Sequence, residues 1–227
     1  MSDFEMDVSF LSGVSTACIS DALDVQGVDG GCQGIRPLVP GLKLHGPAYT
    51  VRFEPVTPGE SAPAADYIDD VPAGAVVVID NGGRTHCTVW GDILAAVAQA
   101  RGINGTVIDG AARDATDIIA LRYPLFSRTA FMKSGKNRVR MSARQLPVTI
   151  GGTLVRPGDL VFGDDSGVIV VPAENLSATA SIARDIEAME QEVMKRVQAG
   201  EKLQQARAAV GYNRFALKQA SSRQERD

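Results

Sequence analysis

The hydrophobic positions of this 227-residue chain indicate a strand, a helix and a second strand near its middle. The run 75–80, Ala-Val-Val-Val-Ile-Asp, is short, β-branched and flanked by turn residues, which predicts a buried strand. Helical spacing follows over 91–101 and stops at Gly102, and 105–109 is a second strand-like run. Together these segments predict a β-α-β unit with parallel strands and a right-handed crossover.

The segments around this unit have weaker patterns, and we expect further elements there. They are a helix over 15–23, a glycine-rich break over 27–34, a strand over 42–53 that turns at Gly46 and Pro47, a short helix over 65–70, a turn at Gly82 and Gly83, a helix over 116–121, and strands near Leu125 and Phe131. The basic segment 133–140 is short and free of aromatic residues, so we interpret it as a solvated loop.

The pattern changes again after residue 148. Strand-length runs over 148–155, 158–163 and 168–172 are joined by Gly and Asp turns, which favours antiparallel or barrel-like pairing. Beyond Pro172 apolar residues recur on one helical face until Gly200, and 203–210 begins another helix. We therefore predict a catalytic domain over 1–172 and a helical tail over 173–227 that mediates homo-oligomerisation.

The composition restricts the partners and the compartment of the chain. The net charge is −4, the sequence pI is about 5.3 and aromatic residues make up 5%, which argues against nucleic-acid binding. Cys18, Cys32 and Cys87 fit neither a disulfide framework nor a metal motif, which favours a reducing cytoplasm. The acidic N-terminus has no apolar signal segment, and no run is long enough to span a membrane. We expect a cytoplasmic protein without nucleic-acid or membrane partners.

Candidate chemistry lies at the two ends of the β-α-β unit. The helix 91–101 carries the chain roughly 16 Å in one direction at ~1.5 Å per residue. The strand 105–109 returns it about as far at ~3.3 Å per residue. Asp92 therefore lies at the same sheet edge as Arg113 and Asp114, so that two carboxylates and a guanidinium can reach one ligand.

This edge suits a small 2-oxo acid. Arg113 can contact its carboxylate or carbonyl, and Asp92 and Asp114 supply oxygen ligands for Mg²⁺. A 2-oxo carbonyl that is polarised by the metal ion and by Arg113 favours formation of an enolate. The free N–H groups that would hold the carboxylate belong to Gly91, Ile93 and Leu94. Spacing alone leaves open a simpler interpretation, in which Asp114 caps a helix, Asp92 is a first-turn acid and Arg113 is a surface cation.

The spacing of Asp92 and the pair Arg113-Asp114 resembles the D-x20-R-D motif of class II pyruvate aldolases. These enzymes cleave 4-hydroxy-4-methyl-2-oxoglutarate or 4-carboxy-4-hydroxy-2-oxoadipate, and their wider family includes the regulator of ribonuclease activity A. The resemblance covers roughly residues 15–212. Other stretches similar to family landmarks are 19–23, 46–51, 81–84, 163–172 and 199–203. Ser166 departs from the pattern, since many relatives carry Asp there.

The resemblance implies a fold, an assembly and a set of roles. The fold is α/β, a swivelling β/β/α domain with a helical C-terminal tail, assembled as a homotrimer or homohexamer with sites at subunit interfaces. Asp114 would ligate a divalent cation, Mg²⁺ or Mn²⁺, and Asp92 would hold water on it. Arg113 would contact the pyruvate carbonyl and the leaving group. The pyruvate carboxylate would be held by the amides around Gly91, Ile93 and Leu94.

Four further residues are weaker candidates. The aldolases take an acidic residue from a neighbour's C-terminal helix, and Glu187 and Glu190 are the candidates for it. Arg84 could meet a second carboxylate of a dicarboxylic substrate, or be an exposed loop cation. His86 could approach the site as an acid or base, or be merely exposed. Cys87 has no His and acid partner to activate it as a nucleophile.

Two functions follow as hypotheses. The first is a divalent-metal-dependent lyase that cleaves a 4-hydroxy-2-oxo acid, of the 4-hydroxy-4-methyl-2-oxoglutarate type, to pyruvate and a second oxo acid. Oxaloacetate decarboxylation would accompany it, because both reactions pass through the same enolate. The alternative is a non-catalytic regulator of ribonuclease activity that acts by protein–protein binding. The intact set of Asp92, Arg113 and Asp114 speaks against this alternative, since a binding protein has no need of it.

Overall fold

A computed structural model describes residues 2–57 and 59–212 and divides the chain into two compact units. Of these residues, 30–57 and 59–173 form one unit, and 2–29 together with 174–212 form the other. Residues 2–29 thus associate with the C-terminal helices, whereas our prediction placed them in the domain 1–172. The oligomerisation role of the C-terminal helices stays a prediction.

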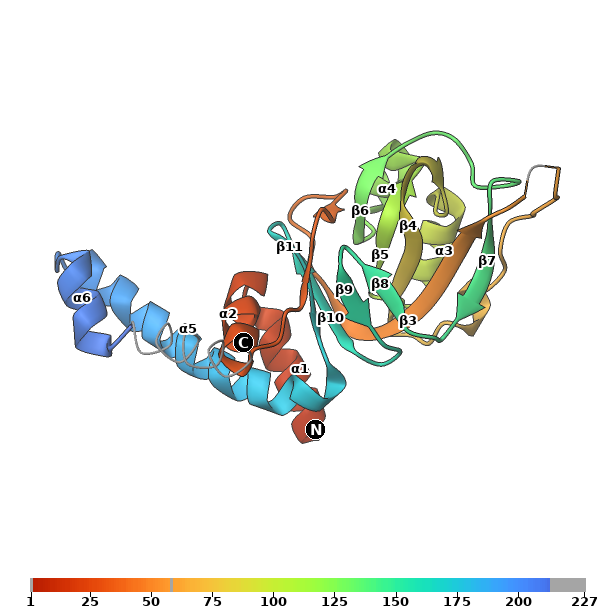
Figure 1. The fold of residues 1–227 in the computed structure, drawn as a ribbon. Helices are drawn as coiled ribbons and strands as arrows, with labels where there is room; N and C mark the ends of the chain where they lie inside the picture. The colour runs from red at the N-terminus through yellow and green to blue at the C-terminus, as the bar shows by residue number, and fades with distance from the viewer. Residues whose placement is uncertain (1, 58, 213–227) are drawn as a thin grey trace. The chain divides into compact units, whose positions relative to one another are not determined.

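The larger unit contains a nine-stranded mixed sheet, and the parallel strands that we predicted lie at its centre (Figure 1). The order is β1-β11-β10-β3-β4-β5-β6-β2, with β7 pairing with β3. Neighbours from β3 to β6 are parallel, and the other pairs are antiparallel. The strands are β1 (Gly31–Cys32), β2 (Arg36–Pro37), β3 (Leu44–Pro55), β4 (Val76–Thr88), β5 (Gly105–Ala112), β6 (Leu125–Ala130), β7 (Val139–Arg144), β10 (Leu160–Asp164) and β11 (Gly167–Val171).

Two hydrophobic clusters cover the two faces of this sheet, because successive side chains of a strand point to opposite sides. In β4, Val77 and Ile79 belong to the cluster that includes Ala95 and Ile118 from the helices α3 (Asp92–Ala100) and α4 (Ala115–Leu121). Val76 and Val78 belong to the opposite cluster, which includes the antiparallel pair β8 (Val148–Ile150) and β9 (Thr153–Val155). The layers are therefore β, β and α, and the predicted α/β fold class is confirmed.

The smaller unit is helical. The helices are α1 (Asp3–Gly13), α2 (Thr16–Gln26), α5 (Leu176–Gln198) and α6 (Leu203–Val210), with a short 3-10 turn over Ala173–Asn175 before α5. Both α1 and α2 contact α5, and Asp7 accepts hydrogen bonds from Ser177 and Arg184. The apolar stripe predicted beyond Pro172 is thus covered within the chain, at least over the first part of α5.

Several local expectations need correction. Residues Gly46 and Pro47 do not turn the chain, because β3 continues through them while it changes partner from β10 to β4. The expected strands near Leu125 and Phe131 are one strand, β6. Where we expected a helix over 65–70, the structure has only the 3-10 turn Ile68–Asp70. The sequence pattern predicted neither α1 nor β7.

Candidate functional site

The candidate site forms where β5 ends and α3 begins. The backbone N–H of Arg113, directly after β5, donates to the carbonyl of Trp90 at 3.0 Å, which joins the two segments. Gly91 precedes the first turn of α3, and Asp114 precedes α4 with φ 56°. This left-handed conformation is unusual for a residue other than glycine and is best tolerated by Asp and Asn. The predicted approach of residues 92 and 113–114 is confirmed.

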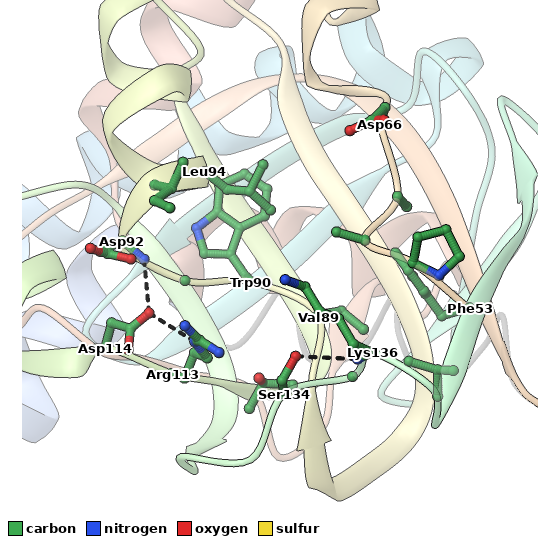
Figure 2. Close-up of a pocket in the computed structure, with 18 of the residues that line it drawn as sticks. Phe53, Asp66, Val89, Trp90, Asp92, Leu94, Arg113, Asp114, Ser134 and Lys136 are labelled. Carbon is green, nitrogen blue, oxygen red and sulfur yellow. Dashed lines mark hydrogen bonds and ion pairs between the residues drawn. The ribbon is translucent and has the colours of Figure 1, made fainter. Parts of the chain in front are cut away.

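Asp114 is the centre of this arrangement (Figure 2). Its Oδ2 accepts a hydrogen bond from Nε of Arg113 at 2.9 Å and one from the backbone N–H of Asp92 at 3.4 Å. Its Oδ1 takes part in neither contact. Gly91 makes the approach possible, because a Cβ at this position would lie 2.6 Å from Oδ2 of Asp114. Glycine is needed here for a close approach.

The environment of Asp114 favours its ionised form. Partial burial raises the pKa of this carboxyl group, but the hydrogen bonds from Arg113 and from Asp92, together with the charge of Arg113, outweigh burial. The net result is a pKa below the ordinary value of an aspartate. Asp114 therefore presents a carboxylate at neutral pH.

A cavity of about 310 Å³ opens beside this pair. This volume lies at the lower end of the range of small-molecule sites, roughly 300–1,000 Å³, and suits a small acid. All six residues of the predicted central set line it: Gly91, Asp92, Ile93, Leu94, Arg113 and Asp114. The simpler interpretation of these residues as caps and surface charges does not account for their meeting at one cavity.

The donor set fits a hard divalent cation. Among the described residues no three His, Cys, Asp or Glu side chains gather as a metal cluster. Mg²⁺, however, usually keeps several waters and takes only one or two protein carboxylates. Asp92 and Asp114 provide two carboxylates at the cavity wall, and Oδ1 of Asp114 is not used by Arg113. Such a pair suits Mg²⁺ or Mn²⁺ better than zinc, which prefers nitrogen and sulfur ligands.

The opposite wall of the cavity comes from two loops that the sequence pattern did not assign to the site. Residues 63–67 and 134–136 line it, together with Phe53, Val89 and Val139. The two loops are joined by Asn137, whose backbone N–H donates to the carbonyl of Ala62 and whose Oδ1 accepts from the N–H of Ala62, both at 2.9 Å. Lys136, which we had placed in a solvated loop, is exposed but lines the cavity.

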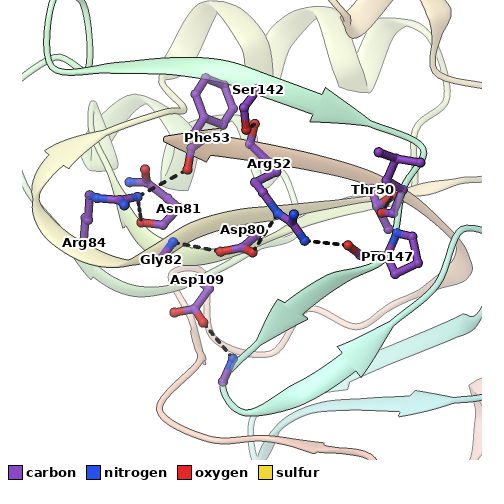
Figure 3. A network of polar contacts seen from close by, with 12 residues as sticks. Thr50, Arg52, Phe53, Asp80, Asn81, Gly82, Arg84, Asp109, Ser142 and Pro147 are labelled. Atoms are coloured by element: carbon purple, nitrogen blue, oxygen red, sulfur yellow. Dashed lines mark hydrogen bonds and ion pairs between the residues drawn. The ribbon is translucent and has the colours of Figure 1, made fainter. Parts of the chain in front are cut away.

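Two of the weaker candidates lie away from this cavity within the chain. One terminal nitrogen of Arg84 donates to the carbonyls of Asn81 and Phe53 at 2.7 and 3.3 Å (Figure 3). The guanidinium thus stabilises the excursion of β4 around Gly82 and Gly83, and Arg84 does not line the cavity. His86 is exposed on the same excursion and does not line the cavity either.

Glu187 and Glu190 lie on α5, in the helical unit, so their reach towards a neighbour's site stays a prediction. Burial and the nearby carboxylates of Asp21 and Glu187 raise the pKa of Glu190. Burial and the same acidic groups raise the pKa of the Cys18 thiol to about 12, so this cysteine stays protonated. Cys87 is also buried and its pKa is raised, in accordance with the prediction that it is not a nucleophile.

A family model described as "RraA-like: Aldolase/RraA" matches residues 16–170. The chain belongs to the RraA-like family. Over 173 residues it is 35% identical to a Halalkalibacterium halodurans protein named "Putative 4-hydroxy-4-methyl-2-oxoglutarate aldolase", covering 76% of this chain and 80% of that protein. It is 42% identical to protein DlpA of Legionella pneumophila over 89% of this chain, but this chain spans only 33% of DlpA.

Solved structures show the same fold. An uncharacterised protein from Pseudomonas syringae is 44% identical, with a TM-score of 0.84 over 89% of this chain and 97% of the other. RraAS2 of Streptomyces coelicolor, described as an unusual member of the RNase ES inhibitor RraA protein family, is 31% identical, with a TM-score of 0.76 over 83% and 96%. Within residues 2–57 and 59–212, every helix is too short or too polar to cross a membrane.

Proposed function

We propose that this chain is a divalent-metal-dependent lyase that cleaves a 4-hydroxy-2-oxo acid to pyruvate and a second oxo compound, and that it also decarboxylates oxaloacetate. The observation that carries the proposal is the meeting of Asp92, Arg113, Asp114 and the first turn of α3 at one cavity. Membership of a family in which relatives bear aldolase names supports the same reaction class.

The substrate carboxylate would bind at the first turn of α3. Gly91, Ile93 and Leu94 line the cavity, and the first N–H groups of a helix lack partners within the helix. The positive end of the helix dipole also favours an anion. This placement directs the 2-oxo group towards Arg113, whose guanidinium would donate to the carbonyl oxygen and stabilise the charge that develops there.

Asp114 would ligate the cation, and Asp92 would hold water on it. When bound, the cation would supply positive charge that stabilises the enolate of pyruvate. The low pKa of Asp114 keeps its carboxylate available as a ligand. Arg113 has a second role in this arrangement, because its hydrogen bond fixes the orientation of Asp114.

Asp92 would serve the proton transfer. In retro-aldol cleavage the proton of the 4-hydroxyl must leave as the C3–C4 bond breaks and C4 becomes a carbonyl. Asp92 would accept this proton, directly or through a water, and the bonding electrons pass to the 2-oxo group as an enolate. Oxaloacetate loses CO₂ to give the same enolate without a hydroxyl proton. A base at Asp92 is thus required for cleavage but not for decarboxylation.

The experiment follows from this difference. Pyruvate release is measured from 4-hydroxy-4-methyl-2-oxoglutarate and from oxaloacetate, with Mg²⁺ or Mn²⁺ and with EDTA, for the wild type, Asp114→Asn and Asp92→Asn. We expect both activities to require metal and to be lost in Asp114→Asn, whereas Asp92→Asn loses cleavage and keeps much of the decarboxylation. No metal-dependent release from either compound would contradict the proposal.

A second function deserves the same experiment, because a structural relative is described as belonging to an RNase ES inhibitor family. A regulator of ribonuclease activity would bind its partner through a surface and would not need Asp114. Partner binding that survives Asp114→Asn, in a protein without metal-dependent turnover, would favour the regulator.

A further inference from the structure

The loop over residues 133–138, between β6 and β7, carries positive charge that the fold does not neutralise. Lys133, Lys136 and Arg138 are all exposed, and none of them forms an ion pair within the described part of the chain. The two arginines at either end of β7, in contrast, are paired with acidic side chains. We call residues 133–138 the basic loop.

Hydrogen bonds hold the backbone of the basic loop in place. The carbonyl of Lys133 accepts from the backbone N–H and from the hydroxyl of Thr88, the last residue of β4, at 3.0 and 3.1 Å. One terminal nitrogen of Arg138 donates to the carbonyls of Ser134 and Lys136 at 3.0 and 3.3 Å. The positive charges are therefore attached to a backbone of defined position.

The basic loop is also part of the cavity wall. Ser134, Gly135 and Lys136 line the cavity, and Figure 2 shows the side chain of Lys136 directed towards Trp90. Because Lys136 lines the cavity and is exposed, its ammonium group lies where the cavity meets solvent. An anion that enters the cavity here approaches this charge before it reaches Arg113.

The local charge around the cavity is opposite in sign to that of the whole chain, which is −4. Arg113 and Asp114 form an ion pair, which leaves the three cations of the basic loop against Asp66 and Asp92 among the lining residues. At physiological ionic strength the Debye length is about 8 Å, so an anion at the cavity responds to nearby charges and little to distant ones. The walls of a cleft further concentrate the local field.

We propose that the basic loop is an electrostatic guide that concentrates doubly charged 2-oxo acids at the entrance of the cavity. This inference rests on the proposed function, because it takes the substrate to react at Arg113 and Asp114. A guide acts on the free substrate, so it lowers KM and leaves kcat unchanged. Its effect increases with the number of charges on the substrate and decreases as salt is added.

Two charge-matched variants test this inference. Lys133→Gln combined with Lys136→Gln removes two charges from the basic loop and keeps Arg138, which holds the backbone of the loop. Lys43→Gln combined with Arg156→Gln changes the net charge equally, at exposed positions that do not line the cavity, and is the control.

The first measurement is the salt dependence of oxaloacetate decarboxylation at constant Mg²⁺. At about 0.05 M NaCl we expect kcat/KM of the basic-loop variant to be about 10-fold below that of the wild type, with kcat within about twofold. At about 0.5 M NaCl the charges are screened, so the two proteins should agree within about twofold. The control variant should follow the wild type within about twofold at both salt concentrations.

The charge of the substrate provides a second measurement. 4-Hydroxy-2-oxopentanoate differs from 4-hydroxy-4-methyl-2-oxoglutarate only in having a hydrogen in place of the second carboxylate. The interaction energy is proportional to the charge of the ligand, so a 10-fold loss of kcat/KM for the diacid corresponds to about a threefold loss for the monoacid.

The other outcomes contradict the inference in distinct ways. If the loss persists at high salt and affects the diacid alone, a lysine of the basic loop contacts the second carboxylate directly and the loop is not a guide. If kcat falls instead of kcat/KM, the loop takes part in the reaction. Equal losses in the variant and the control would show that the position of the charges does not matter. If the wild type releases no pyruvate from any of the three compounds in the presence of metal, the proposed function itself fails.

Discussion

Two aspartate–arginine pairs lie near the carboxyl ends of the parallel strands, and they have different consequences. Asp109 of β5 is nearly buried, with 8% of its side chain exposed, and both of its oxygens are used. Oδ1 pairs with Arg128 of β6, and Oδ2 accepts from the backbone N–H of Gly151 at 2.8 Å. Figure 3 shows Asp109 directed towards this backbone group.

Asp114 follows the same strand but is less completely used by the protein. Its side chain is 27% exposed, and both of its contacts fall on Oδ2. The Asp109 pair therefore connects β5, β6 and the turn between β8 and β9, whereas the Asp114 pair presents a carboxylate to a cavity. Both pairs join an aspartate to an arginine near a strand end, so residue type and position do not tell a structural ion pair from a candidate ligand set. What distinguishes the two is the second carboxylate oxygen: in Asp109 it accepts a hydrogen bond from Gly151, whereas in Asp114 neither of the two contacts uses it.

The strongest test of this comparison is Asp114→Asn. Asparagine tolerates the left-handed backbone at this position but lacks the charge, so the fold should persist. We expect kcat for pyruvate release to fall about 100- to 1,000-fold, as when one electrostatic stabiliser is removed from an active site. Thermal denaturation provides the control, with a change within about 1 kcal/mol. If the variant unfolds, Asp114 has a structural role like that of Asp109.

Asp109→Asn should show the reverse behaviour. It leaves Arg128 without its charged partner in a largely buried position, which costs about 3–5 kcal/mol for fully buried pairs. Because 30% of Arg128 remains exposed, we expect a loss of about 2 kcal/mol in the free energy of unfolding, measured by urea denaturation. At temperatures where the variant is folded, its kcat should stay within about threefold of the wild type. A loss of kcat without a loss in the free energy of unfolding would show that Asp109 acts in catalysis and not only in the fold.

Gly91→Ala tests how closely Asp114 is positioned. The added methyl group would meet Oδ2 at 2.6 Å and must displace Asp114 or the start of α3. A displacement of this size should lower kcat/KM about 10-fold for oxaloacetate. Gly13→Ala is the matched control, because a Cβ there has no neighbour within 4 Å. Equal activities of the two variants would show that the Asp114 contact is not needed.

The smallest effect is expected in the acidic group around Glu190. Burial, Asp21 and Glu187 raise the pKa of Glu190, so the folded protein holds its proton more tightly than the unfolded chain. The free energy of unfolding therefore falls as pH rises from the ordinary carboxyl pKa to the raised one. Glu190→Gln should flatten this dependence and gain at most about 0.5 kcal/mol at pH 7. Pyruvate release by the same variant also tests whether Glu190 serves a neighbour's site, and unchanged kcat would exclude that role.

The sequence predicted the part of the site that depends on strand and helix periodicity. The run 75–80, the helix after Gly91 and the strand after Gly105 were sufficient to bring Asp92 to Arg113 and Asp114, because a β-α-β unit returns the chain to the same edge. The burial of β4 on both of its faces likewise follows from its continuous apolar run. These features depend on local sequence patterns, and the regular geometry of helices and strands then determines where the chain returns.

The remainder depends on contacts that have no local pattern. The cavity wall opposite Arg113 and Asp114 comes from loops at 63–67 and 134–136, which are joined by the hydrogen bonds between Asn137 and Ala62. Arg84 was a candidate to bind a second carboxylate, but the excursion around Gly82 and Gly83 directs it to the backbone carbonyls of Asn81 and Phe53. The change of partner within β3 at Gly46 and Pro47 also depends on distant strands, so a local turn signal was misleading.

The pair of hydrogen bonds between Asn137 and Ala62 has a kinetic consequence. One amide proton is protected by the Asn137 side chain and the other by the Ala62 carbonyl, so separating the loops exposes both at once. Hydrogen–deuterium exchange at these two amides should therefore proceed at a common opening rate, and a ligand held in the cavity should slow both equally. Asn137→Ala removes the bond that protects the Ala62 amide, so in this variant only the backbone amide of residue 137 still reports how often the two loops separate.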